Sequence, residues 1–329
     1  MKRESSILVT GASGMIGSAV CRNLAEQRFD SVLTPPRSEL DLLDGPAVER
    51  YFRKHRPEFV FLLAARVGGI AANAADPAGF LSENGRIILN LFEAIRKFPP
   101  RKALFAGSSC VYPRDCLQPM REESLWTGPF EPTNEGFAVA KAMGLRLAAF
   151  HERQFGVVTV CPILCNVYGT NDTFDPERSH VLSALVRKFV DAADGNLASV
   201  TLWGTGVPRR DFLHVDDAAM ALALLMDQAK TSEPMNVGPG CDISIRELAE
   251  LVGRLAGYRG EVRWDPARHD GMPRKCLDVS RISTFGFRAE IGLSEGVSRT
   301  IGEYRALKAS GKLKAANPRP SPRRKEQVR

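Results

Sequence analysis

A patterned set of glycines lies between a short apolar run and a helix within the first 20 residues. The apolar residues of Ser6–Thr10 predict a buried strand, and the stretch Gly11–Gly17 follows it directly. In such a pattern the first glycine allows a tight turn, the second lets the backbone approach a pyrophosphate, and the third permits close helix–strand packing. The following helix offers free amides and a positive dipole end to phosphates. The stretch therefore predicts a dinucleotide-binding α/β domain, with candidate cofactor contacts at Gly11, Ser13, Gly14, Met15, Ile16 and Gly17.

Further strands and helices alternate along the chain with short links. Apolar runs predict strands at residues 31–34, 58–65, 102–106 and 157–164, and longer amphipathic stretches predict helices at 84–97 and 134–155. This alternation is typical of a doubly wound parallel sheet, here of the Rossmann kind. We expect residues 1–170, with 211–233 returning, to form the NADP-binding domain. We expect residues 171–210 and 234–310 to form a smaller C-terminal α/β substrate domain, including a helix at 245–256.

The second predicted strand carries the information on cofactor choice. An NAD-preferring site has an acid there for the ribose 2′-hydroxyl, whereas this chain has Arg37, which suits a 2′-phosphate. The sequence therefore favours NADP(H), although Arg37 as an ordinary surface arginine is the alternative. Asp44, a little further on, is the candidate contact to the adenine.

Four residues at candidate catalytic positions are predicted to lie near the carboxyl edge of the sheet. Ser108 and Cys110 follow the strand at 102–106, and ligands bind at that edge in open α/β sheets. Phe137 and Lys141 are four residues apart on a predicted helix and share a face. A Ser at a strand end with Tyr-x-x-x-Lys on a helix is the catalytic arrangement of short-chain dehydrogenases, but the tyrosine position holds Phe137.

The chain resembles the extended short-chain dehydrogenase/reductases and, within them, the GDP-L-fucose synthase family, the GDP-4-keto-6-deoxy-D-mannose epimerase/reductases. The Ser-Ser-Cys-Val-Tyr-Pro string from Ser108, with Ser179-His180 further on, carries this resemblance best. The matching segments are residues 11–17, 66–70 (where Arg66 replaces a family lysine), 107–113, 131–135, 179–189, 203–217 and 270–279.

The resemblance implies one site with two reactions. Cys110 and His180 would be the acid/base pair that epimerises C3 and C5 of GDP-4-keto-6-deoxy-mannose, and their ordinary pKa values suit proton transfer near neutrality. Ser108, a tyrosine and Lys141 would serve NADPH-dependent reduction of the C4 ketone. Candidate substrate contacts are Arg187, Trp203, Arg210 and Lys275.

Phe137 leaves the reductive step open, because a phenylalanine cannot donate a proton to the ketone oxygen. The enzyme could be an epimerase alone, or it could reduce slowly with Ser108 or a water as donor; a deliberate substitution is a third reading. A non-catalytic NADP-binding protein is the competing class, since a fold does not imply a function. Retention of Ser108, Cys110, Lys141 and His180 opposes it.

The charge distribution and the cysteine content indicate which classes of partner and ligand the chain is expected to bind. Six of the seven net positive charges come from residues 311–329, so the basicity belongs to a tail predicted to be disordered and does not indicate nucleic acid. The seven scattered cysteines and five histidines suggest neither a disulfide framework nor a metal site. With no apolar stretch of spanning length, we expect a cytoplasmic protein without a membrane partner. We also expect a homodimer through the helices near 84–97 and 135–155.

Overall fold

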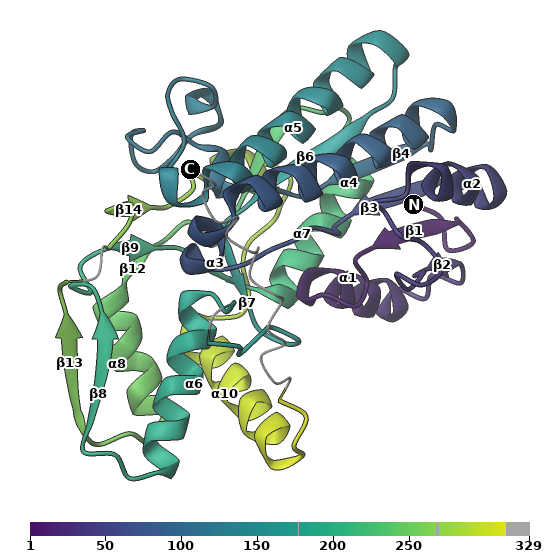
Figure 1. Cartoon of the computed structure of the whole chain (residues 1–329). Coiled ribbons are helices and arrows are strands. Elements are labelled where there is room, and N and C mark those ends of the chain that lie inside the picture. The colour runs from purple at the N-terminus through teal and green to yellow at the C-terminus, as the bar shows by residue number, and fades with distance from the viewer. Residues whose placement is uncertain (177, 268–269, 314–329) are drawn as a thin grey trace, which may run out of the picture.

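The computed structural model describes residues 1–176, 178–267 and 270–313 (Figure 1). Its main feature is a seven-stranded sheet in the order β11-β6-β4-β3-β1-β2, with β5 pairing with β6. Every neighbouring pair in this sheet is parallel, as the sequence predicted. The strands are β1 (Ile7–Thr10), β2 (Val32–Leu33), β3 (Phe59–Leu62), β4 (Lys102–Phe105), β5 (Gly107–Ser108), β6 (Thr159–Leu164) and β11 (Pro234–Val237).

Helices cover both faces of the sheet, which is why its strands are continuous apolar runs. On one face α4 packs against α5 and α2, and on the other α1 packs against α7 (Figure 1). These helices are α1 (Met15–Glu26), α2 (Gly45–His55), α4 (Pro77–Lys97), α5 (Glu135–Phe155) and α7 (Val215–Gln228). Among the helices of the described ranges, none is both long and apolar enough to traverse a bilayer.

A second hydrophobic core lies below the sheet in the view of Figure 1. It is built from α6 (Val181–Asp194), α8 (Ile245–Ala256), α10 (Leu293–Ala309) and the parallel pair β8 (Ser199–Trp203) and β13 (Glu261–Asp265). The bounds of α8 match the predicted helix. Ser244 and Glu247 form a reciprocal capping box at its start, and Gly257 ends it in the left-handed conformation with φ +78°.

Shorter elements connect the two cores. They are α3 (Ile70–Ala75), β7 (Asn166–Tyr168), β9 (Arg209–Arg210), β10 (Phe212–His214), β12 (Ile243–Ser244), β14 (Arg274–Lys275), α9 (Ser280–Ser283) and the 3-10 turns η1 (Ser109–Val111), η2 (Glu122–Ser124) and η3 (Pro132–Asn134). β7 pairs with β10, and β9 lies between β12 and β14.

The expected assignment of residues 234–237 to the smaller domain is wrong. These residues form β11, whose ladder with β6 runs from Pro234 opposite Cys161 to Val237 opposite Leu164. An apolar strand buries its surface best beside another buried strand, and β6 offered the free edge of the large sheet. The rest of the domain division stays a prediction, and the predicted disordered tail lies largely outside the described residues.

The predicted helix at 84–97 begins earlier than expected. Pro77 opens α4, and the carboxylate of Asp76 caps it by accepting a hydrogen bond from Gly79 N at 3.0 Å. An aspartate at the N-cap followed by proline at the first helical position is a strong start signal. That signal adds the seven residues before Asn84 to the helix.

Candidate active site

A cavity of about 1770 Å³ lies between the two cores, at the carboxyl edge of the large sheet. Sites for single small ligands usually measure about 300–1,000 Å³, so this cavity has room for a cofactor and a substrate together. All the site residues predicted from the sequence line it except Asp44. The fold therefore brings residues from position 11 to position 275 into one space.

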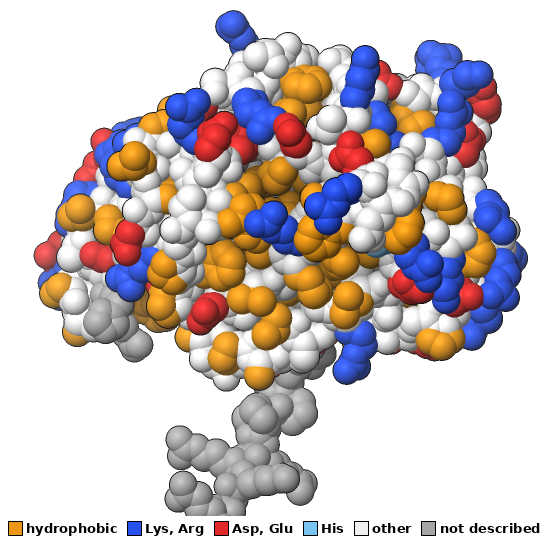
Figure 2. All heavy atoms as spheres, turned by 90° about the horizontal axis from the view of Figure 1, so that it is seen from above, with side chains coloured by type: hydrophobic (Ala, Val, Ile, Leu, Met, Phe, Trp, Pro, Cys, Tyr) orange, Lys and Arg blue, Asp and Glu red, His pale blue; other side chains and the backbone are white. Residues whose placement is uncertain are grey.

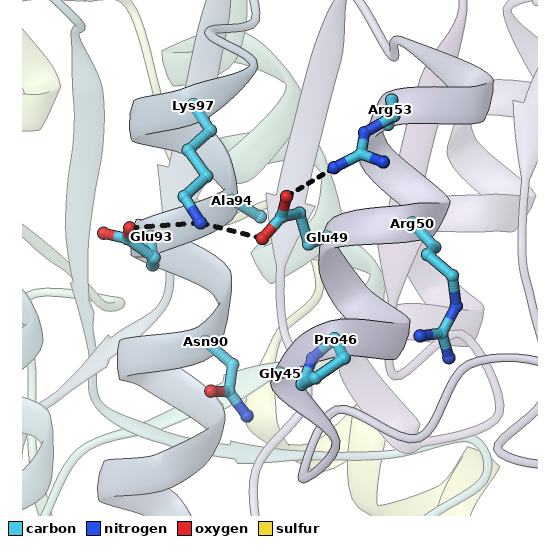
Figure 3. A pocket seen from close by; sticks show the side chains of 9 residues that line it. All are labelled: Gly45, Pro46, Glu49, Arg50, Arg53, Asn90, Glu93, Ala94 and Lys97. Carbon is cyan, nitrogen blue, oxygen red and sulfur yellow. Dashed lines mark hydrogen bonds and ion pairs between the residues drawn. The ribbon is translucent and has the colours of Figure 1, made fainter.

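A smaller depression of about 400 Å³ lies between α2 and α4 (Figure 3). Its carboxylates are already paired: Glu49 contacts Arg53 at 2.6 Å and Lys97 at 2.7 Å, and Glu93 lies 3.6 Å from Lys97. Exposed ion pairs of this kind contribute little energy, and both carboxylates of this depression already have cationic partners. The large cavity is therefore the candidate site.

The glycine turn has the geometry that the sequence predicted. Gly11 has φ +73°, and a Cβ at Gly11 would stand 2.9 Å from the Cα of Ala64. A Cβ at Gly17 would stand 2.1 Å from the carbonyl oxygen of Gly11, so only glycine lets α1 approach the turn this closely. Thr10 fixes the neighbouring strand end, because its hydroxyl donates to Phe61 O and accepts from Leu63 N and Ala64 N. The resulting backbone cradle fits a dinucleotide pyrophosphate.

The two predicted contacts to the adenosine end of the cofactor, Arg37 and Asp44, differ in whether they line the cavity. Arg37 lines the cavity with its side chain 65% exposed and 3.5 Å from Asp41, a weak ion pair that leaves the guanidinium accessible. Asp44 lies outside the cavity lining and caps α2, accepting a hydrogen bond from Ala47 N at 3.1 Å. Asp44-Gly-Pro is a helix-start pattern, so the capping role of Asp44 could have been predicted from the sequence. Asp41 is the acid that lines the cavity here.

Lys141 and Phe137 lie one turn apart on α5 and both face the cavity. The ammonium of Lys141 donates to Ala106 O at 2.7 Å and lies 5.6 Å from the centre of the Phe137 ring. Burial lowers the pKa of Lys141 to about 8, although the nearby Cys110 acts in the opposite direction. None of the five tyrosines of the chain lines this cavity. No phenolic proton donor therefore stands beside Lys141.

Ser108 and Cys110 follow β4 in the order that the sequence predicted. Ser108 belongs to β5, and its hydroxyl accepts a hydrogen bond from Cys110 N at 3.4 Å. Burial raises the pKa of the Cys110 thiol, while the positive charges of Lys275 and Lys141 lower it. Burial likewise lowers the pKa of Lys275. The Cys110 thiol, with two buried lysines near it, can release a proton within the cavity, and its thiolate can take one up.

His180 reaches the same cavity from the start of α6. Its side chain makes no capping hydrogen bond to that helix, so capping is not its role. Beside it, Asp172 accepts a hydrogen bond from the Ser183 hydroxyl. Burial raises the pKa of Asp172, and the Ser183 bond and the charge of His180 lower it. Asp172 lies in a polar loop without a motif, which is why sequence reasoning missed it.

The predicted substrate-binding side chains lie along the C-terminal part of the cavity. Arg187 donates to Phe174 O at 2.9 Å, and Trp203 is 61% exposed at the rim. Burial lowers the pKa of Arg210, against the opposing charges of Asp211, Glu131 and Asp270. The charges of Arg210 and Lys275 act on each other, and both, like Arg187, are cations of the cavity lining that suit phosphate groups.

The chain matches the family model described as the NAD dependent epimerase/dehydratase family over residues 7–238. It is 43% identical to the GDP-L-fucose synthase of Escherichia coli (strain K12), over 90% of this chain and 95% of that one. It is 41% identical to GDP-L-fucose synthase 1 of Arabidopsis thaliana, over 92% and 94% respectively.

A solved structure of a GDP-sugar enzyme is also similar to this chain. MlghC, a GDP-mannoheptose C4 reductase from Campylobacter jejuni with NADP bound, superimposes with a TM-score of 0.84 and 32% identity. The match covers 93% of this chain and 99% of that one. The fold class predicted from the sequence is thereby confirmed.

Proposed function

Because the chain belongs to the NAD dependent epimerase/dehydratase family, and within it groups with the GDP-L-fucose synthases, we propose that it epimerises C3 and C5 of GDP-4-keto-6-deoxy-D-mannose. An NADPH-dependent reduction of the C4 ketone would then give GDP-L-fucose. The observation that carries this proposal is the convergence of Ser108, Cys110, Lys141 and His180 on one cavity.

The residues present fit NADP(H). The glycine turn at Gly11–Gly17 would hold the pyrophosphate, Arg37 the 2′-phosphate and Lys141 the nicotinamide ribose. When bound, NADPH supplies the hydride for a ketone. Lys141 keeps a positive charge beside the reacting carbonyl, and Ser108 offers the oxygen a hydrogen bond.

The epimerisation needs only groups of this chain. The ketone acidifies the C–H bonds at C3 and C5, so one group can remove a proton and a second can return one from the opposite face. Cys110 and His180 come from different segments and both line the cavity, and a thiol and an imidazole are side chains that ordinarily exchange protons near neutral pH. Arg187, Arg210 and Lys275 would hold the GDP phosphates.

Proton exchange tests this function without depending on reduction. The protein is incubated with the 4-keto sugar nucleotide in D₂O, and NMR follows deuterium entry at C3 and C5. We expect incorporation at both carbons. If neither C3 nor C5 takes up deuterium in protein that binds NADPH, the result would instead support a non-catalytic NADP-binding role.

An epimerase without reductase activity is the second candidate, and Phe137 favours it. A positioned general acid typically contributes about 10²–10⁴-fold to a rate, and here its position beside Lys141 holds a hydrocarbon ring. Under this reading C3 and C5 exchange normally while NADPH oxidation stays near background.

Replacing Arg37 with alanine should weaken NADPH binding by about 10-fold to 100-fold and leave NADH binding unchanged. The reason is that a charge-assisted hydrogen bond to a phosphate is lost and only NADPH carries that phosphate. Fluorescence titration of both cofactors measures the effect, with Arg50→Ala, an exposed arginine of α2, as the control. If the variant binds NADPH and NADH more weakly by the same factor, Arg37 does not contact the 2′-phosphate.

We also propose that the chain forms a homodimer through α4 and α5. Figure 2 shows hydrophobic side chains gathered in the middle of the face that lies at the top of Figure 1, where these helices lie. Leu81 and Leu89 of α4 and Phe150 of α5 are 39%, 50% and 41% exposed, and exposed apolar patches often mark protein–protein interfaces. Light scattering at micromolar concentration should give the mass of two chains.

Leu89→Glu should convert the dimer to a monomer, because it buries a charge in an apolar interface. Leu117→Glu is the matched control, since Leu117 is 87% exposed in the loop after η1. A single-chain mass for the unmutated protein, or a dimer that survives Leu89→Glu, would contradict this interface.

A further inference from the structure

One wall of the large cavity holds four polar atoms that have no hydrogen-bond partner in the protein although they are buried. They are Asn73 Oδ1, Glu131 Oε2, Asn134 Oδ1 and Ser179 Oγ, and all four residues line the cavity. Buried polar atoms are nearly always hydrogen-bonded, because leaving one unpaired costs the full desolvation of that group. Four such atoms on one cavity indicate a surface built for a ligand. We call these four residues the polar wall.

The four residues come from three segments that touch one another. α3 carries Asn73 and packs against η3, which includes Asn134 and follows Glu131. Gly69, just before α3, donates from its amide to Arg178 O at 3.2 Å, and a Cβ there would stand 2.9 Å from Ser179 O. The polar wall is therefore one continuous surface.

Asn73 has its amide orientation fixed by the backbone. The side chain is 5% exposed, and its Nδ2 donates to Gly68 O at 2.8 Å and to Gly69 O at 3.0 Å. Exchanging the two amide atoms would set an oxygen against two carbonyl oxygens, so the assignment is secure. Oδ1 is thus an acceptor held in place without a donor.

Glu131 is fixed in the same way. Its Oε1 accepts from the amide of Thr133 at 3.4 Å and from the hydroxyl of Thr133 at 3.2 Å. Its Oε2 forms an ion pair with Arg114 Nε at 3.6 Å, which is beyond hydrogen-bond distance, and it accepts no hydrogen bond. The carboxylate therefore presents a second fixed acceptor.

The chemistry of the polar wall selects its ligand. Three of its four atoms can only accept hydrogen bonds, and one carries a negative charge, so it suits neutral donors and repels phosphate. Hydroxyl groups are such donors. The cations that suit phosphates, Arg187, Arg210 and Lys275, lie on other segments of the same cavity, and of these Arg210 is near enough to Glu131 for the two charges to interact.

Resting on the proposed function, we propose that the polar wall binds the C2 and C3 hydroxyls of the hexose. In GDP-4-keto-6-deoxy-mannose the GDP occupies C1, C4 is a ketone and C5 bears a methyl group. The free hydroxyls of the sugar are therefore those at C2 and C3 alone. Holding them would fix the ring over Ser108 and Lys141 and would select sugars that carry both hydroxyls.

Titration calorimetry of the full chain with GDP-mannose and with GDP tests this inference. GDP-mannose carries both hydroxyls and has no ketone, so it does not turn over, and GDP has no sugar. Glu131→Gln keeps the acceptor toward Thr133 and turns the Oε2 position into a donor. We expect this variant to bind GDP-mannose about 10-fold or more weakly, with unchanged affinity for GDP.

A cavity carboxylate outside the polar wall serves as the control. Glu83 lines the same cavity, 3.6 Å from Arg66, and contributes no atom to the polar wall, so Glu83→Gln should leave both affinities unchanged. A GDP-mannose analogue without the C3 hydroxyl should bind the unmutated chain more weakly than GDP-mannose. In Glu131→Gln or Asn134→Ser, loss of that hydroxyl should cost less, because its partner is already gone.

The inference is overturned if Glu131→Gln binds GDP-mannose as tightly as the unmutated chain, or if GDP and GDP-mannose weaken by the same factor. The latter result would mean that the whole cavity had changed. Failure of the proposed function looks different: the variants would weaken GDP-mannose selectively, while no deuterium enters C3 or C5 of the 4-keto substrate.

Discussion

Phe137→Tyr is expected to raise NADPH turnover with the 4-keto sugar nucleotide by about 100-fold or more. The substituted side chain lies one turn before Lys141 and faces the same cavity, and its ring centre is 5.6 Å from the Lys141 ammonium. A hydroxyl at the ring edge adds one atom and keeps the backbone. The buried positive charge of Lys141 would lower the pKa of that hydroxyl and make it a better proton donor.

NADPH oxidation measured by absorbance checks this result, with Phe137→Leu as the control. The leucine variant also replaces the phenylalanine ring but brings no hydroxyl, so it should show no increase. Deuterium exchange at C3 and C5 should stay unchanged in both variants, because epimerisation does not use this position. An absent increase for Phe137→Tyr would mean that the ketone does not lie beside residue 137. Fast reduction by the unmutated protein would identify a different proton donor.

Cys110→Ser is expected to slow deuterium exchange at C3 and C5 by about 10²–10⁴-fold. Serine has nearly the same shape, so the cavity and the hydrogen bond from residue 110 N to the Ser108 hydroxyl should persist. A hydroxyl is far less acidic than a thiol, however, and hardly ionises near neutral pH. NMR in D₂O measures the exchange, and GDP-mannose affinity should remain unchanged.

A buried cysteine outside the cavity provides the comparison for this variant. Cys161 lies in β6, and its thiol donates to Thr159 O at 3.2 Å. Cys161→Ser should change the exchange rate little. If both serine variants exchange deuterium equally fast, Cys110 is not the acid or base.

The parts of the fold that the sequence predicted well depend on local rules. Gly11 and Gly17 could be assigned because a positive φ and a close backbone approach admit almost no other residue. α8 could be bounded exactly because Ser244, Glu247 and Gly257 define its two ends. Each of these signals is complete within a few neighbouring residues.

The parts that the sequence did not reveal depend on contacts between distant segments. Nothing in residues 234–237 says that they pair with β6 and not with the smaller core. The acceptors of Asn73 and Glu131 escaped notice for a similar reason, since an atom is unpartnered only in relation to every other segment around it. For Asp44 the sequence alone could not separate a helix cap from an adenine contact, because both call for the same side chain, and the structure shows the cap.

The late position of β11 in the chain has a consequence for biosynthesis. A ribosome releases β6 well before β11, so the outer edge of β6 stays unpaired while α6, β8, β10 and α7 are still being made. An open strand edge is a template for pairing with another chain, and partly made chains are prone to such aggregation. The large sheet can therefore be completed only after residue 237 has been synthesised.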